Sequence, residues 1–103
     1  MRMLLKVNIP TEAGNAAIRD GRLGEVMESA LQELQPEAAY FTLENGMRTA
    51  LLFVDLADPS QMPPTGERFF MEMGASIDMT PAMNAEELRR GLSELRAAMP
   101  AGG

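Results

Sequence analysis

The sequence predicts an α+β domain in which one antiparallel sheet of four strands has helices packed against one of its faces. Several segments alternate apolar and polar residues with the period of two that strands show. Two longer segments carry apolar residues at the three- and four-residue steps of a helix. Between two strand-like segments stands Asn45-Gly46, the strongest short signal for a two-residue hairpin.

Length and charge limit the organisation and the partners. With 103 residues the chain forms one domain, expected at residues 1–99, with residues 100–103 as a flexible tail. The net charge of −6 argues against binding nucleic acid or an anionic membrane surface, because both require basic patches. No run approaches the roughly 20 apolar residues of a membrane span. We therefore expect a cytoplasmic protein.

The residues that are missing exclude several kinds of chemistry. The chain has no Cys, so it has no thiol nucleophile, no disulfide and no thiolate metal site. It has no His, which removes the commonest general base and the commonest transition-metal ligand. Its ten Met residues are scattered through the predicted elements, which favours adaptable packing over a Cu(I) site. We expect no metal and no cofactor.

The first half of the chain predicts a strand and a long helix. Residues 3–9 form the strand, which Pro10 ends because proline cannot donate to a ladder. A helix is expected at residues 12–34, with Thr11 as its N-cap and a weak point at residues 20–21 or at Gly24. The strand face expected against the helices consists of Met3, Leu5, Val7 and Ile9.

The hairpin contains the most apolar segment of the chain. Residues 38–44 form its first strand and residues 47–56 its second. The second strand is apolar on both faces, which predicts that both faces are covered. We expect Leu51 and Phe53 to meet the helices, with Leu52 and Val54 on the opposite face.

The second half predicts a loop, a short helix, a strand and a final helix. Pro63-Pro64 indicates a loop, followed by a helix at residues 65–73 and a strand at residues 75–83. Asn84 and Glu87 have the spacing of a capping box that opens the last helix. The apolar contacts expected of the two helices are Phe69, Phe70 and Met73 in the first, and Leu88, Leu92, Leu95 and Met99 in the second.

This element order, βαββαβ followed by a helix, is that of a ferredoxin-like fold with strand order 4-1-3-2. The helices cover one face of such a sheet and leave the other to water. Apolar residues on an uncovered face mark an interface, so we expect a homodimer that pairs through the sheet. Its interface candidates are Leu4, Leu52, Val54 and Leu56.

Five polar residues are candidates for binding a ligand. They are Lys6, Asn8, Tyr40, Arg48 and Asp78, all expected on or beside the uncovered face. Lys6 and Asp78 lie on adjacent strands, where they form either an acid–base pair or, as we favour, a cross-strand ion pair. The Tyr40 hydroxyl either donates to a substrate oxygen or lies at the rim of an interface.

The element order, the doubly apolar hairpin strand and three stretches resemble the dimeric α+β barrel superfamily, in particular small uncharacterised bacterial members. The stretches are GNAAIRDG at 14–21, PEAAYFT at 36–42 and PAMNAEEL at 81–88. The resemblance implies that two sheets pair into a barrel. The superfamily includes cofactor-independent monooxygenases, muconolactone-isomerase-like enzymes, haem proteins and stress-responsive barrels without known chemistry. This chain has no His and so differs from the haem-binding members. The resemblance assigns no catalytic residue to this chain.

Three functions are compatible with these observations. The first is a dimeric barrel that binds a small organic ligand. The second is a cofactor-independent monooxygenase- or isomerase-like enzyme that acts on a small aromatic or carbonyl compound. The third is a protein-interaction module. A closed pocket with converging polar side chains distinguishes the enzyme from the other two.

Overall fold

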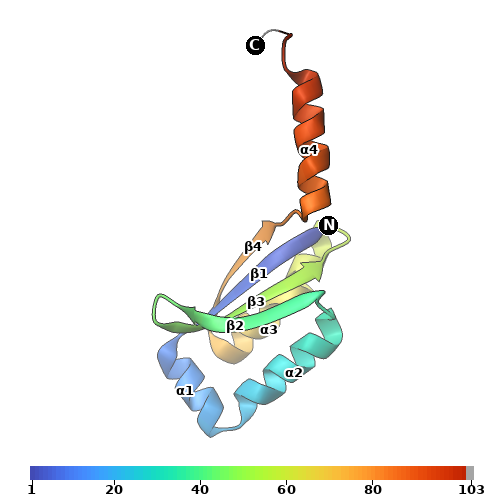
Figure 1. The fold of residues 1–103 in the computed structure, drawn as a ribbon. Coiled ribbons are helices and arrows are strands. Elements are labelled where there is room, and N and C mark those ends of the chain that lie inside the picture. The colour runs from blue at the N-terminus through green and yellow to red at the C-terminus, as the bar shows by residue number, and fades with distance from the viewer. Residues whose placement is uncertain (102–103) are drawn as a thin grey trace.

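A four-stranded antiparallel sheet forms the centre of the computed structural model, which describes residues 1–101; residues 102 and 103 of the predicted tail lie outside that range (Figure 1). The strands are β1 (Arg2–Ile9), β2 (Ala38–Glu44), β3 (Met47–Asp55) and β4 (Ser76–Pro81). The helices are α1 (Thr11–Arg19), α2 (Arg22–Leu34), α3 (Met62–Met73) and α4 (Ala85–Ala98), with a 3₁₀ turn η1 (Pro59–Gln61). The order β2-β3-β1-β4 is the predicted order read from the other edge. The α+β class and the strand order are therefore confirmed.

The predicted long helix is two helices. Gly21 adopts a left-handed backbone with φ 75° between α1 and α2, so the chain turns at the predicted weak point. Thr11 was expected to cap this segment, but it is the first helical residue and Pro10 precedes it without a side-chain cap. Proline has no side-chain acceptor, so the first N–H groups of α1 receive no side-chain cap.

The hairpin forms as predicted. Asn45 and Gly46 both have positive φ, 52° and 75°, as a type I′ turn requires. Glu44 then pairs with Met47, and the register continues to Ala38 opposite Phe53.

Helix α3 begins earlier than predicted. The two prolines at 63 and 64 were expected in a loop, but they lie in the first turn of α3, which starts at Met62. The first turn tolerates proline because its N–H groups have no partner within the helix. Before it, the side chain of Asp58 accepts a hydrogen bond from the Ser60 N–H and caps η1.

The core lies between the sheet and α1, α2 and α3. Leu5 and Val7 from β1 are fully buried, as predicted. In β3 the expected faces are reversed: Leu52 pairs with Leu5 and points to the helices, whereas Leu51 pairs with Lys6 on the other side. The prediction for this strand is therefore wrong by one residue, which inverts every side chain.

The last helix stands apart from this core. Figure 1 shows α4 projecting beyond the end of the sheet at which β4 ends. Its capping box is formed: the Asn84 side chain accepts from the Glu87 N–H and the Glu87 carboxylate accepts from the Asn84 N–H, both at 2.8 Å. No residue of α4 is buried.

Candidate functional site: the open face of the sheet

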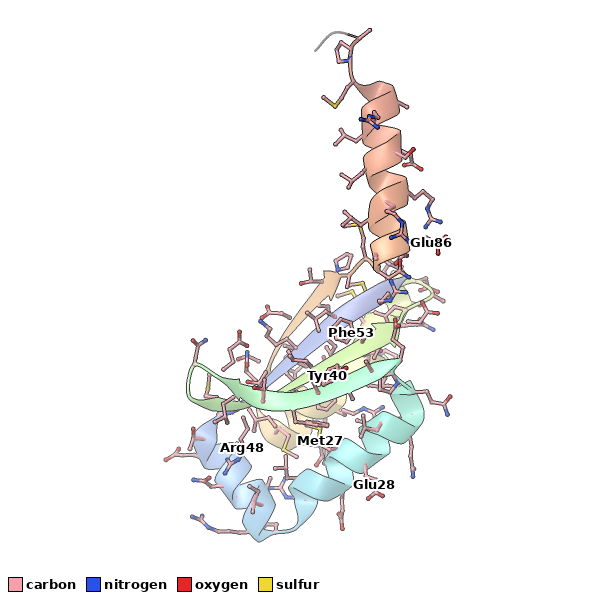
Figure 2. All side chains as sticks on the ribbon, viewed as in Figure 1. Met27, Glu28, Tyr40, Arg48, Phe53 and Glu86 are labelled. Carbon is pink, nitrogen blue, oxygen red and sulfur yellow. The ribbon has the colours of Figure 1, made fainter. Side chains whose placement is uncertain are left out.

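The sheet face opposite the helices, called here the open face, has ordered rows of side chains that cross all four strands. The strand registers place residues of β2, β3, β1 and β4 side by side in each row. The first row is Ala38, Phe53, Leu4 and Thr80; the second is Tyr40, Leu51, Lys6 and Asp78; the third is Thr42, Thr49, Asn8 and Ser76. Figure 2 shows Tyr40 and Phe53 on this side of the sheet. The open face thus combines an apolar row with two mixed or polar ones.

Lys6 binds a different carboxylate from the one expected. It lies directly opposite Asp78, as predicted, but its Nζ is 3.0 Å from Glu44 Oε1, across β3. The expected Lys6–Asp78 ion pair is therefore absent from the ion pairs of residues 1–101. Among the hydrogen bonds of the same residues, none uses the Asp78 carboxylate or the Tyr40 hydroxyl. These two exposed groups remain available to a ligand or to a second molecule.

Asn8 is held by its neighbour on β3. The Thr49 hydroxyl donates to Asn8 Oδ1 at 2.8 Å, and Thr49 itself is only 3% exposed although it lies on the open face. This bond fixes the Asn8 side chain and leaves its amide N–H₂ group free to donate. Asn8 therefore fits a binding role or a structural one equally well on its position alone.

Arg48 does not belong to the open face. It pairs with Ile9 and with Leu43, both on the helix side, and its Nη2 donates to Asn15 Oδ1 at 3.0 Å. Gly14 explains the local geometry, because a Cβ there would lie 2.5 Å from Arg48 Nη1. The guanidinium thus lies against α1, and the prediction that Arg48 accompanies Tyr40 is wrong.

Only one of the four predicted interface residues lies on the open face. Leu4 is there and is half-buried, whereas Leu52, Val54 and Leu56 belong to the core beneath the helices. The apolar residues that replace them on the open face are Leu51 and Phe53, which the sequence analysis assigned to the helices. The hairpin register contained the missing signal: a two-residue turn at 45–46 places Leu51 beside Tyr40.

A second apolar surface lies on the helix side, along the free edge of β2. A groove of about 380 Å³ runs there between α2 and the sheet. We call it the edge groove; its apolar lining is Ile9, Leu23, Met27, Phe41, Leu43 and Ala50. Phe41 and Leu43 are 58% and 72% exposed, so the groove opens to solvent. The sequence predicted an uncovered surface only on the open face, so this groove was not expected.

Arg2 joins three segments at the end of the sheet near α4. Its guanidinium binds the carboxylates of Glu37, the residue before β2, and Glu87, in the first turn of α4. It also donates to the Ala82 carbonyl oxygen at 3.3 Å. The Asn84 N–H, and secondly the Arg2 guanidinium, hold the pKa of Glu87 below its ordinary 4.5. These contacts fix the direction in which α4 leaves the body.

This arrangement predicts how α4 responds to acid. A carboxylate whose pKa is lower in the folded state stabilises that state above the unfolded pKa and loses the effect as pH falls through the folded pKa. We expect the Glu87 carboxyl, followed by NMR, to titrate with a midpoint below 4.5. In Arg2→Ala the midpoint should rise but stay below that value, because the Asn84 N–H still donates. An unchanged midpoint in Arg2→Ala would show that the ion pair does not form.

Residues 1–101 contain neither a cluster of metal ligands nor a helix that could span a membrane. Among residues 1–101, no three His, Cys, Asp or Glu side chains are grouped so that they could hold a metal ion. In the same range, each helix is too short or too polar to cross a bilayer.

The comparisons with known proteins found no relatives. No protein-family model matches the chain, no curated protein is significantly similar to it, and no solved structure matches it.

Proposed function

We propose that the protein binds a small organic molecule between two copies of the chain whose open faces pack together. In this assembly each chain is a ferredoxin-like domain and the two sheets form a dimeric α+β barrel. The observation that carries the proposal is the apolar row of Leu4 and Phe53, continued by Leu51, on the side that the helices leave uncovered. Apolar patches of this kind on a soluble protein mark interfaces.

The rows also suggest where a ligand would lie. The third row consists of short side chains: Thr42, Thr49, Asn8 and Ser76. Two sheets pack about 10 Å apart and are filled by the side chains between them. Long side chains in the neighbouring rows would meet across the interface, whereas the short ones would leave space. That space would be lined by hydroxyl and amide groups, with Tyr40, Lys6 and Asp78 beside it.

Binding is favoured over catalysis by the state of these polar groups. The amine of Lys6 is already 3.0 Å from Glu44 Oε1, and the Asn8 oxygen accepts from Thr49. Arg48 is not on the open face with the other candidates, because its guanidinium donates to Asn15 of α1. Groups that neutralise one another in this way can orient a ligand, but they do not form a nucleophile paired with a base.

The pairing is tested by the mass of the protein in solution. Light scattering should give about twice the chain mass of 11.2 kDa for the wild type and the single-chain mass for Leu51→Arg. Gln32→Arg adds the same charge at an exposed position of α2 and should remain dimeric. A monomeric wild type would overturn the proposal.

The ligand site is tested with an aromatic probe, 1-anilinonaphthalene-8-sulfonate. Its fluorescence should rise saturably with the folded dimer, because the enclosed space excludes water. Asn8→Leu, which fills the space without changing the charge, should weaken this binding while the mass stays that of a dimer. Binding that is absent, or unchanged in Asn8→Leu, would contradict a site at the third row.

A further inference from the structure

Helix α4 presents an apolar stripe that the rest of residues 1–101 leaves uncovered. The stripe consists of Leu88, Leu92, Leu95 and Met99, which are 46%, 54%, 56% and 53% exposed. Their spacing of four, three and four residues is the a/d spacing of a two-stranded coiled coil. An isolated helix of 14 residues is marginal in water. The stripe therefore requires a partner surface.

The exposed area indicates how large that partner surface is. The chain exposes 6989 Å², about 1,300 Å² more than the ~5,700 Å² expected of a folded monomer of its mass. The radius of gyration is 17.4 Å, against about 13 Å for a compact domain of this length. A stable interface buries about 800 Å² on each partner. The excess is therefore enough for an interface that includes α4.

Arg2 holds the first turn of α4 on the open-face side of the sheet. Side chains two residues apart on a strand share a face, so Arg2 points to the same side as Leu4, which belongs to the open face. The Arg2 guanidinium binds the Glu87 carboxylate in the first turn of α4. Arg2 also belongs to β1, one of the two central strands, and Figure 1 shows the base of α4 beside the N-terminus. The helix therefore begins close to a central strand, on the side where the second copy is proposed.

The stripe is turned toward that same side. Figure 2 shows Glu86 on the right of α4, whereas the sheet with Tyr40 and Phe53 extends to the left. Each residue advances about 100° around a helix, so Leu88 and Leu95 lie roughly opposite Glu86. The stripe and the open face are thus directed toward one neighbour.

The residues beside the stripe favour a parallel partner helix. With the stripe at the a and d positions of a heptad, the e positions are Arg89 and Arg96 and one g position is Gly91. In a parallel pair an e residue faces a g residue, so Arg96 of one helix would meet Gly91 of the other. In an antiparallel pair an e residue faces an e residue, so Arg89 would meet Arg96 and repel it. Charge therefore selects the parallel arrangement.

We infer that the α4 helices of two copies pack against each other as a short parallel coiled coil. The inference rests on the proposed pairing of open faces. A two-fold axis parallel to the strands, between the two sheets, brings both α4 helices to the same end of the dimer and points them the same way. Above the middle of the sheet, this axis places the two β1 strands about 11 Å apart, from ~10 Å between sheets and ~4.8 Å between neighbouring strands. That separation is close to the 8–10 Å between packed helices.

Pairing of the sheets compensates for the short length of the stripe. Leu88 to Met99 span two heptads, fewer than the three or four that a coiled coil sustains. When the open faces hold two chains together, however, the helices meet at an effective concentration on the order of mM. Helix α4 then strengthens the dimer instead of forming it alone. It also determines which two-fold axis relates the copies.

Disulfide formation tests the parallel arrangement, and the absence of natural Cys makes the test specific. In a parallel pair the two copies of residue 88 are adjacent, within the roughly 4.4–6.8 Å between Cα atoms that a disulfide spans. In an antiparallel pair residue 88 faces residue 99, which separates the two copies of residue 88 by about 16 Å along the helices.

We expect the full-length Leu88→Cys chain to form a disulfide-linked dimer on mild oxidation, seen by electrophoresis without reductant. Leu88 is 46% exposed, so the substitution leaves the core of the body intact. Ala97→Cys lies on the opposite side of α4 and should stay unlinked. No disulfide in Leu88→Cys, or equal linkage in both variants, overturns the inference.

The dimer constant gives a second and independent readout. Leu92→Asp should raise the dissociation constant of the dimer by about tenfold or more, because two carboxylates would face each other in the seam. Ala97→Asp adds the same charge outside the seam and should leave the constant unchanged. An unchanged constant in Leu92→Asp would contradict the pairing of α4.

The two proposals fail in different ways. If Leu51→Arg gives monomers while Leu88→Cys forms no disulfide, the pairing of open faces stands and the pairing of α4 fails. If Leu88→Cys forms the disulfide while Leu51→Arg remains dimeric, the α4 helices pair and the proposed function fails instead.

Discussion

Replacing Leu52 by alanine is expected to lower the free energy of unfolding by about 2–5 kcal/mol, measured by urea denaturation. The side chain is fully buried between the sheet and the helices, where it lies next to Leu5. Removing it leaves a cavity that the neighbouring elements cannot fill. In a domain whose total stability is about 5–15 kcal/mol, a loss of this size removes a large share of the free energy of unfolding.

Leu51 provides the matched control, because it is the adjacent residue with the same side chain on the other face. Leu51→Ala should cost less than Leu52→Ala, and its cost should depend on protein concentration because the open face meets a second copy. The Leu52→Ala loss arises within one chain. If Leu51→Ala were the more damaging substitution, the faces of β3 would be those that the sequence analysis expected.

Phe69→Ala should destabilise the protein by about 3–5 kcal/mol, as aromatic truncations in cores do. Phe69 is the largest fully buried side chain of the protein. It holds α3 against the sheet, and its carbonyl oxygen accepts from the Ala75 N–H at 3.2 Å where the chain turns toward β4. Truncation to alanine removes the packing of the ring in the core and keeps this backbone hydrogen bond. Thermal unfolding followed by circular dichroism measures the effect.

The neighbouring aromatic residue is again the control. Phe70 is 46% exposed, so Phe70→Ala should change stability by much less than Phe69→Ala. Comparable losses from the two substitutions would mean that Phe70 packs against something that covers it. A concentration-dependent loss would identify that cover as a second copy.

The elements of the fold could be predicted from the sequence because each has a local cause. The Asn45-Gly46 turn needs two residues that accept positive φ, and the Asn84–Glu87 capping box opens α4 through its own side chains. The strand order followed from the order of the elements. Local chemistry of this kind does not depend on tertiary packing, which is why these features were correct.

The faces of β3 could not be chosen from its own residues. Leu51 and Phe53 are as apolar as Leu52 and Val54, so the periodicity does not show which face meets the helices. The register of the hairpin determines which face it is. With a two-residue turn, Tyr40 shares a face with Leu51, so placing Tyr40 on the open face requires Leu51 there as well. Applying the register across the turn would have corrected three interface candidates and moved Arg48 to the helix side.

The position of α4 and the existence of the edge groove could not be predicted from the sequence for a different reason. The spacing of Leu88, Leu92, Leu95 and Met99 predicts an apolar stripe but not the surface it meets. An amphipathic helix buries its stripe against any suitable layer, whether in its own chain or in another. Only the three-dimensional arrangement shows that α4 leaves the body and that the groove lies at the other edge of the sheet.

The projecting helix also affects the hydrodynamic friction of the protein. With extents of 63 × 28 × 19 Å, a single chain is more than twice as long as it is wide. An elongated particle experiences more friction than a sphere of the same mass, so it diffuses more slowly and leaves a sizing column earlier. A lone chain with α4 extended would elute close to where a compact dimer does. Because the Arg2–Glu87 ion pair holds α4 in its extended direction, we expect a frictional ratio above that of a globular protein, and sedimentation velocity measures that ratio directly.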